Sequence, residues 1–291
     1  MNGDRFAAEE AGVLECVGGH EGDLLLGVEP TRRIPYLAQV LGERITPADG
    51  QVYLAALGDV ERAQTAMEQF HPVAALSGSL MAHENVLVPR SQPLINLLRT
   101  AMERMTDDLP EQPAILDMGC GSGCCALLAA QVWPQAAVLA TDHLPEAAAT
   151  AKINTGRFEA LQLVRSGAVT VAEPGDLFET VGEASFDLII FNAPWVTAPA
   201  RNRMETALND GGQQTVQRFL HGAATRLKPG GRVLLGYADH SGPNAIARLE
   251  RFIGDAGLIQ VHKHTNRIKT HRSKRAWESI IAYDLRLGES R

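Results

Sequence analysis

The stretch "ILDMGCGSG", residues 115–123, decides the fold class of this chain. An apolar strand of Ile115 and Leu116 leads into Asp117, and a helix-like run, "CCALLAAQVW", follows. The turn between them contains three glycines, which let a ligand approach the backbone, and the helix start offers free N–H groups. The glycine spacing is G-x-G-x-G, and Cys124 stands where the dinucleotide fingerprint requires a further glycine. The stretch therefore predicts a nucleotide-like ligand and counts against NAD or FAD.

From about residue 112 onward, short β-rich runs alternate with helix-length segments. This alternation predicts an α/β fold, a Rossmann-like doubly wound and mostly parallel sheet with helices on both faces. The runs "LIQVHKH" and "SIIAYDLR" near the end predict an antiparallel pair, and so an antiparallel edge strand. We assign residues 109–291 to this domain.

The N-terminal part has a different pattern. Residues 31–70 have apolar positions at helical spacing, with breaks at Thr46-Pro47 and Asp49-Gly50. This pattern predicts a small helical domain over residues 1–80, with a role in choosing the substrate. Residues 81–108 are expected to be a connector, with a short β run at Val86 to Val88 and a helix from about Ser91 to Met105.

The composition favours a small-molecule or protein partner. Of 291 residues, 45% are apolar and 21% charged, which is typical of a globular protein with a sizeable core. The net charge of -7 argues against RNA as the partner, because phosphate attraction needs a positive surface. No apolar run is long enough to span a membrane. The four cysteines (Cys16, Cys120, Cys124 and Cys125) lack a zinc-ligand pattern, so we expect no metal and a cytoplasmic location.

Acidic residues end the next two predicted strands. Asp142 closes "VLATD", and Asp176 with Leu177 lies in "EPGDLF". Because parallel strands end at one edge of a sheet, these residues are expected beside the glycine turn. Asp142 suits the hydroxyls of a ribose, although it is also suited to capping the helix that follows. Asp176 and Leu177 are suited to flanking an adenine ring, or else form a solvated turn.

The strand "FDLIIFNAPW" ends in an unusual turn, Asn192 to Trp195, in which a large aromatic replaces ordinary turn residues. With this turn, the chain resembles the class I S-adenosylmethionine-dependent methyltransferases. Within that class it is similar to the "methyltransferase small" group, which includes the release-factor and ribosomal-protein glutamine methyltransferases. The resemblance covers residues 83–285 and rests on motifs in a shared order: "NVLVPR", "DMGCGSG", Asp142, "GDLF", "NAPW", "ALNDGG" and "LKPGG".

The resemblance implies S-adenosyl-L-methionine as cofactor and assigns the site residues. The implied cofactor-binding residues are Asp117, Gly119, Cys120, Gly121, Ser122, Gly123, Asp142, Asp176, Leu177 and Asn192. Asn192, Pro194 and Trp195 are implied to be catalytic, and Asn192, Ala193, Pro194, Trp195 and Arg90 to bind the substrate. The group has Pro where this chain has Ala193, and Tyr or Phe where it has Trp195.

In the group's turn, the Asn oxygen and a backbone carbonyl accept hydrogen bonds from a planar NH2 group, and the aromatic ring covers its face. The resemblance therefore implies methyl transfer to an amide or amine nitrogen of a protein or small molecule. Two alternatives stay open. One is a methyltransferase of specialised metabolism acting on O, N or C of a small molecule, and the other is a non-catalytic binding module.

A basic stretch, "HKHTNRIKTHRSKR", covers residues 262–275 within the expected final strand pair. Its charge is compatible with a solvated loop, an acidic substrate or an RNA phosphate. RNA is the less favoured partner because of the negative charge of the whole chain.

Overall fold

The computed structural model describes residues 14–20, 23–28, 46–48, 52–56, 70–81, 86–87, 92–269 and 277–288. Arg90, Val88 and the end of the basic stretch at 270–275 therefore lie outside the described residues, as do most of the helices predicted between 31 and 70.

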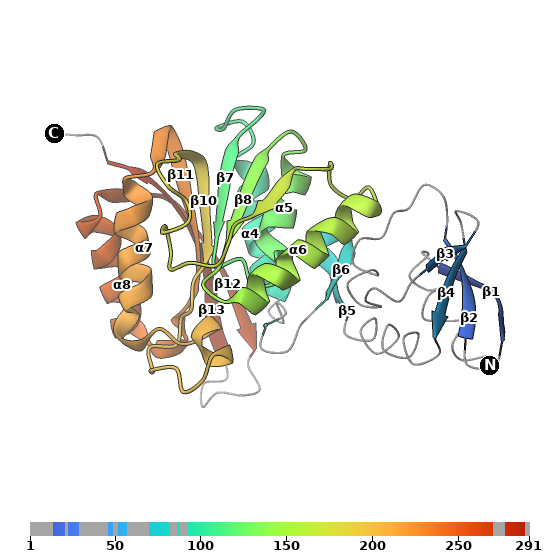
Figure 1. The fold of residues 1–291 in the computed structure, drawn as a ribbon. Coiled ribbons are helices and arrows are strands. Elements are labelled where there is room, and N and C mark those ends of the chain that lie inside the picture. Colours follow the sequence, from blue (N-terminus) through green and yellow to red (C-terminus); the bar gives the residue numbers. More distant parts are fainter. Residues whose placement is uncertain are drawn as a thin grey trace.

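A seven-stranded sheet forms the body of the molecule (Figure 1). Its strands, from one edge to the other, are β12 (Leu258–Lys269), β13 (Trp277–Leu287), β11 (Leu227–Ala238), β10 (Phe186–Asn192), β7 (Ala114–Met118), β8 (Ala137–Thr141) and β9 (Val169–Val171). The five strands from β11 to β9 are parallel, and β13 is antiparallel to both of its neighbours. The predicted Rossmann-like sheet and its antiparallel final pair are confirmed. The strand that runs in the opposite direction is β13, one position in from the edge.

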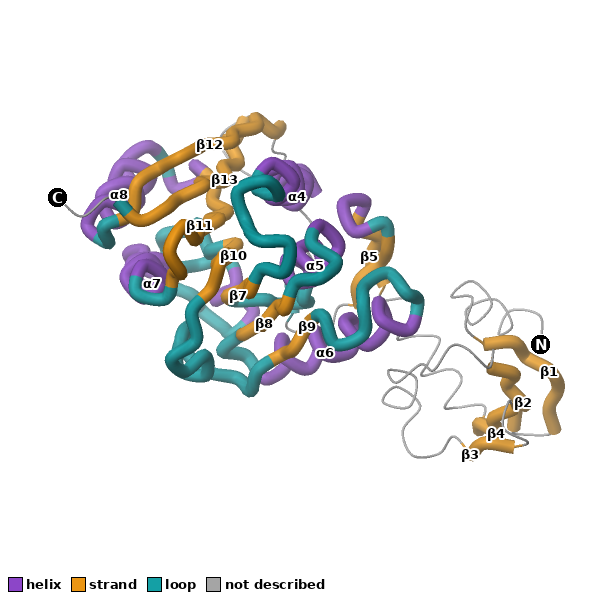
Figure 2. Tube along the Cα trace, turned by 90° about the horizontal axis from the view of Figure 1, so that it is seen from above, coloured by secondary structure: helices purple, strands orange, loops and turns teal. Residues whose placement is uncertain are grey.

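Helices cover both faces of this sheet, as Figures 1 and 2 show. One face carries α4 (Gln92–Arg104), α5 (Cys124–Val132) and α6 (Pro145–Ala160), and the other carries α7 (Gln214–Ala224) and α8 (Pro243–Asp255). Two apolar clusters fill the space between sheet and helices, one on each face. Apart from Asp187 and the terminal Asn192, the central strand β10 is apolar, and it is buried until its last residue because helices cover both faces of the sheet. The sheet thus directs ligand binding to its strand ends.

A hairpin of β5 (Phe70–Val73) and β6 (Gly78–Met81) packs on the α5 and α6 side. The buried Asn154 of α6 accepts a hydrogen bond from the Met81 N–H at 2.8 Å. Its Nδ2 donates to the carbonyls of Met81, at 3.1 Å, and Ser122, at 2.8 Å. One amide side chain therefore joins the hairpin to the glycine turn, although the sequence placed residues up to 80 in a separate domain.

In the connector, the predicted helix from about Ser91 is α4. The predicted β run at Val86 to Val88 is wrong for Val86 and Leu87, which have no strand structure. Val86 instead forms a small buried cluster with Leu144 and Ala147. Its apolar character reflects this packing rather than strand pairing.

The described N-terminal residues form strands. They are β1 (Leu14–His20), β2 (Asp23–Val28), β3 (Thr46–Ala48) and β4 (Val52–Ala56), in an antiparallel sheet of order β1-β2-β4-β3. The helical character predicted for this domain is therefore wrong at 14–20, 23–28 and 52–56, and the segment 46–48, which holds the predicted break at Thr46-Pro47, is also a strand. Asp49-Gly50, interpreted as a helix break, lies between two strands in which Ala48 pairs with Val52. An Asp-Gly pair between short apolar runs is also a hairpin signal, and the antiparallel pairing of β3 with β4 agrees with that interpretation.

Candidate active site

A pocket of about 390 Å³ opens at the carboxyl ends of β7, β8 and β10. Its volume falls within the roughly 300–1,000 Å³ typical of small-molecule sites. Most of the predicted cofactor and substrate residues line it: Asp117, Gly119, Cys120, Gly121, Ser122, Asp142, Asp176, Leu177, Asn192, Pro194 and Trp195. The fold therefore brings together motifs spread over almost eighty residues, because parallel strands end at one edge of the sheet.

The glycine turn between β7 and α5 leaves the backbone accessible. Gly119 has a φ of +62°, and a Cβ there would lie 2.9 Å from the Phe191 ring. Gly121 has a φ of +54°, and a Cβ there would meet no atom within 4 Å, so open space lies against its backbone. Gly123 precedes α5 as its N-cap; a Cβ there would lie 3.3 Å from the Ala151 Cβ, and this predicted cofactor residue does not line the pocket. The first two glycines thus form the surface on which a ligand would lie.

Asp117 ends the strand side of this turn and is 1% exposed. Its Oδ2 accepts a hydrogen bond from the Ala126 N–H of α5 at 2.8 Å. Burial raises the pKa of Asp117 to about 8; the Ala126 hydrogen bond opposes this rise, and the nearby Asp142 carboxylate adds to it. A buried acid in this state favours a cationic neighbour, because a positive charge would stabilise its ionised form.

Asp142 is also buried, and both of its oxygens hold backbone donors. Oδ2 accepts from the Gly121 N–H and Oδ1 from the Leu144 N–H, each at 2.9 Å. The N-cap of α6 is Leu144, without a side-chain cap, so Asp142 is not the capping residue that the sequence also allowed. Each carboxylate oxygen has two acceptor positions, so the side chain retains capacity for ligand hydroxyls.

Asp176 and Leu177 follow β9 and line the same pocket. The Asp176 carboxylate forms an ion pair with Arg218 of α7 at 2.5 Å, and its backbone N–H donates to Glu179 at 3.0 Å. Leu177 has a φ of +49° and packs beside the apolar cluster on the α7 side. Leu177 thus offers an apolar contact, while the Asp176 carboxylate is shared with Arg218.

Asn192 is the last residue of β10 and carries a polar atom without a partner. Its Oδ1 is buried and accepts no hydrogen bond from any residue that the structure describes. Gly236 of β11 lies opposite, where a Cβ would lie 3.0 Å from this Oδ1. A glycine within a strand indicates a close approach, and that signal in "LLGYA" could have identified Gly236. A buried acceptor left unpaired costs about 1–3 kcal/mol, so Asn192 is suited to an incoming N–H donor.

The rest of the turn divides between core and pocket. The Ala193 N–H donates to the Gly236 carbonyl at 3.1 Å, and its side chain belongs to the core and does not line the pocket. Pro194 and Trp195 do line it. Trp195 is half-buried against both apolar clusters, and its carbonyl accepts from Ser241 Oγ at 3.0 Å. The indole therefore both packs and faces the pocket.

Sequence reasoning missed several lining residues. His143 and Thr206 lie at the pocket, as do Cys124 and Cys125. Burial raises the pKa of the Cys120, Cys124 and Cys125 thiols above the ordinary value, so they remain protonated and pack as small apolar groups. The part of the chain that the structure describes contains no group of three or more residues suited to hold a metal ion.

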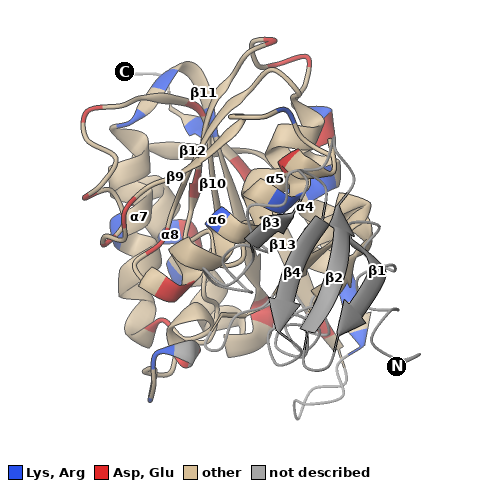
Figure 3. Ribbon diagram, turned by 45° about the vertical axis from the view of Figure 1, so that its right-hand side comes forward, with Lys and Arg blue, Asp and Glu red and all other residues tan. Residues whose placement is uncertain are grey.

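The described part of the basic stretch, residues 262–269, lies on β12, the exposed edge strand. Acidic and basic positions otherwise intermingle along the helices and loops (Figure 3). Among the described residues, no helix is long and apolar enough to cross a membrane.

The strand order, the glycine turn and the polar strand ends define the Rossmann-like fold of methyltransferases. The family model "Methyltransferase small domain" matches residues 96–269, and the chain belongs to this family. The crystal structure of a proposed RNA methyltransferase from Pyrococcus horikoshii has the same fold, with a TM-score of 0.50. It is 19% identical and covers 76% of this chain and 90% of its own.

Curated relatives are glutamine methyltransferases. A release factor glutamine methyltransferase from Geobacter sulfurreducens is 32% identical over 162 residues, 52% of each chain, so the match spans about half its length. One from Bordetella pertussis is 32% identical over 66% of this chain and 72% of its own. A ribosomal protein uL3 glutamine methyltransferase from the same organism is 33% identical over 56% and 58%. These relatives confirm the family predicted from the sequence.

Proposed function

We propose that this protein transfers a methyl group from S-adenosyl-L-methionine to the side-chain amide nitrogen of a protein glutamine. The observation that carries the proposal is the buried and unpaired Oδ1 of Asn192 in a pocket wall that also contains Pro194 and Trp195. The names of the curated relatives support a glutamine as the acceptor.

A second set of pocket residues, which we call the cofactor wall, fits the cofactor; it consists of Asp117, Gly121, Asp142 and Leu177. Two buried acidic side chains, Asp117 and Asp142, lie beside a glycine turn with open space at Gly121, which suits a cationic ligand that carries a ribose. Asp142 would hold the ribose hydroxyls, and Leu177 would contact the adenine ring. The cofactor supplies a methyl group on a sulfonium, which is a good leaving group.

The acceptor wall, formed by Asn192, Pro194 and Trp195, would orient the nitrogen of the acceptor. Asn192 Oδ1 accepts one amide N–H, and the Trp195 ring covers the face of the planar group. This arrangement directs the nitrogen toward the methyl group of the cofactor. Alignment of two reactants is worth effective molarities on the order of 10⁵ M or more, so positioning can supply much of the rate.

The test is labelling with a methyl-labelled cofactor. The protein would be incubated with purified release factors and ribosomal proteins, and modified residues would be located by mass spectrometry. Label on a glutamine amide that forms much more slowly with Asn192→Ala supports the proposal. Label found only on RNA would overturn it, as would a calorimetric titration without cofactor binding, which would favour a non-catalytic module.

A small-molecule acceptor is the second candidate, favoured by one observation. Ala193 and Trp195 depart from the family turn, and Trp195 lines the pocket with a larger aromatic surface. Incubation of the protein with the same labelled cofactor and a metabolite extract distinguishes the two candidates. With a small-molecule acceptor, the label would appear in the small-molecule fraction and not in the protein fraction.

A further inference from the structure

The connection between β10 and α7 forms a strap, residues 196–213, along one side of the pocket. Within the strap, the Val196 N–H donates to the Leu208 carbonyl at 2.9 Å and the Asp210 N–H to the Val196 carbonyl at 2.8 Å. A short 3-10 helix, η3 (Met204–Ala207), lies between these contacts, and Thr206, Ala207 and Leu208 line the pocket. The strap is therefore a wall of the site.

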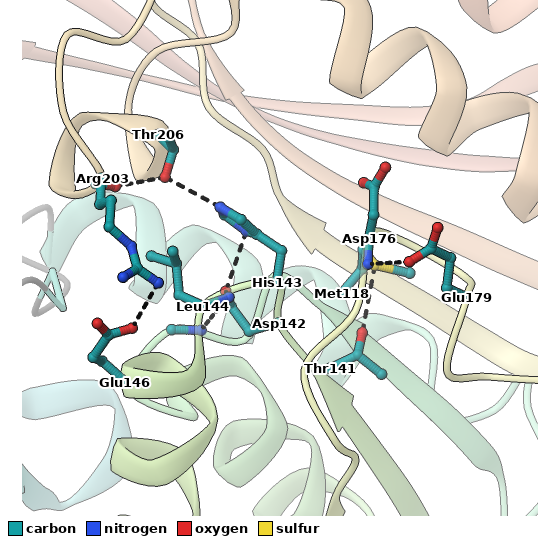
Figure 4. Close-up of polar contacts among 11 residues, drawn as sticks. Met118, Thr141, Asp142, His143, Leu144, Glu146, Asp176, Glu179, Arg203 and Thr206 are labelled. Atoms are coloured by element: carbon teal, nitrogen blue, oxygen red, sulfur yellow. Dashed lines mark hydrogen bonds and ion pairs between the residues drawn. The ribbon is translucent and has the colours of Figure 1, made fainter.

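Two side-chain contacts join η3, together with the preceding Arg203, to the segment that leads into α6 (Figure 4). Arg203 pairs with Glu146 at 3.3 Å, and Thr206 Oγ1 lies 3.3 Å from His143 Nε2. The other ring nitrogen of His143, Nδ1, lies 3.4 Å from Asp142 Oδ1. One imidazole thus bridges the strap and the carboxylate that we assign to the ribose.

Proton counting defines the state of this imidazole. The Thr206 hydroxyl has one proton, and while it donates that proton to the Arg203 carbonyl at 2.6 Å it can only accept from His143. The Asp142 carboxylate is likewise an acceptor. In this arrangement both ring nitrogens carry protons, which describes the imidazolium. A neutral ring has one N–H, so it keeps both contacts only if the Thr206 hydroxyl turns from the Arg203 carbonyl to donate to the ring.

We propose that His143, as the imidazolium, is a positioning residue that fastens the strap over the cofactor pocket, so that cofactor retention weakens when the ring loses its proton. The proposal rests on the proposed function, because it takes the cofactor as the ligand. His143 touches neither reacting atom and acts through Asp142 and Thr206.

The charges around His143 determine the sign of the pH effect. The contact with Asp142 raises the pKa of His143, partial burial opposes this, Asp176 adds to the rise, and Arg203 lowers it. Glu146 forms an ion pair with Arg203, so its negative charge offsets that of the guanidinium near the ring. A raised pKa means that the bridge is present on the acid side and is lost as the pH rises through the pKa.

The test measures the affinity for S-adenosylhomocysteine by calorimetry at about pH 6 and about pH 8.5. For His143→Gln, we expect binding about three- to tenfold weaker than wild type near pH 6, and nearly equal near pH 8.5. Taking the ratio to wild type removes the titration of Asp117, which both proteins share. Thr206→Val should weaken binding similarly near pH 6, because it breaks the strap side of the bridge.

Lys152→Gln is the matched control, since it removes a cation from α6 that pairs with Glu173 away from the strap. Its affinity should equal wild type at both pH values. Hydrogen exchange of residues 203–208 in the bound protein supplies a second readout, and His143→Gln should lose protection there.

The outcomes separate the two proposals. A wild-type protein that binds no cofactor contradicts the proposed function itself. If wild type binds and both bridge variants bind equally well at both pH values, the strap proposal is overturned. A loss of the same size at every pH would also overturn it, since that pattern indicates packing rather than a proton.

Discussion

The two walls of the pocket are built differently. On the cofactor wall, Asp117 and Asp142 already accept backbone N–H groups from Ala126, Gly121 and Leu144. On the acceptor wall, Asn192 Oδ1 is buried without a partner within the described chain, and Trp195 is only half-buried. The acidic side chains of the first wall already have hydrogen-bond partners within the protein, whereas the second wall has a hydrogen bond left to form.

This difference indicates where binding energy and selectivity arise. Prebuilt carboxylates keep their geometry and lose little conformational freedom when a cofactor binds. The unpaired oxygen instead rewards only an acceptor with an N–H in the right place, because other groups leave it unsatisfied. We therefore expect the cofactor wall to set the affinity for the cofactor and the acceptor wall to select the group that reacts.

The largest expected effect comes from the acceptor wall. Asn192→Ala should lower the rate of methyl transfer by roughly 10² or more, because the loss of alignment costs about 3 kcal/mol in the transition state. Single-turnover kinetics with saturating cofactor measures this rate, and cofactor affinity should change only slightly. Normal turnover in this variant would remove the contrast between the walls and require another acceptor atom with a base elsewhere.

On the cofactor wall, Asp142→Ala should weaken S-adenosylmethionine binding by about 2 kcal/mol, since hydrogen bonds to a charged group are worth about 1.5–3 kcal/mol. Calorimetric titration gives the affinity, and a thermal unfolding curve checks that the fold survives. Asp142→Asn retains one acceptor oxygen, so its affinity for S-adenosylmethionine should lie between those of wild type and Asp142→Ala. An unchanged affinity would mean that Asp142 only shapes the turn with Gly121 and Leu144.

Substitutions of Trp195 should have a smaller effect on the acceptor wall than the substitution of Asn192. Trp195→Ala should raise the acceptor KM by about tenfold, because stacking of aromatic groups contributes about 0.5–1.5 kcal/mol. Trp195→Phe should retain appreciable activity, since a smaller ring still covers a planar group. If Trp195→Ala unfolds the protein while Asn192→Ala turns over normally, the turn is a structural plug.

The smallest expected effect is the release of a proton when the cofactor binds. Because burial raises the pKa of Asp117 to about 8, this acid is mostly protonated near neutral pH. A cationic sulfonium in the pocket should shift it toward the carboxylate, so binding should release up to about one proton near pH 7. Affinity for S-adenosylmethionine, relative to S-adenosylhomocysteine, should then rise with pH up to about 8 and level off above it. Calorimetry in buffers of different ionisation enthalpy counts the protons, and equal release with both ligands would contradict this account.

The sequence alone was sufficient for the sheet and for most of the pocket. The βαβ alternation, the turn at 115–123 and the polar strand ends are local patterns, and parallel topology then places those ends together. The N-terminal strands were missed for the converse reason. Short apolar runs such as Val52–Ala56 fit a helix or a strand equally well, and only the pairing with β2 and β3 settles which.

Tertiary structure decided the contacts between residues far apart in the chain. Gly236 approaches Asn192 because β10 and β11 pair in one register, and β13 enters between β11 and β12 after the chain has passed the edge. Thr206 reaches His143 across 63 positions, and Arg203 reaches Glu146 across 57. Periodicity and turn chemistry act over a few residues, whereas these partners depend on how the strap folds back over the finished sheet.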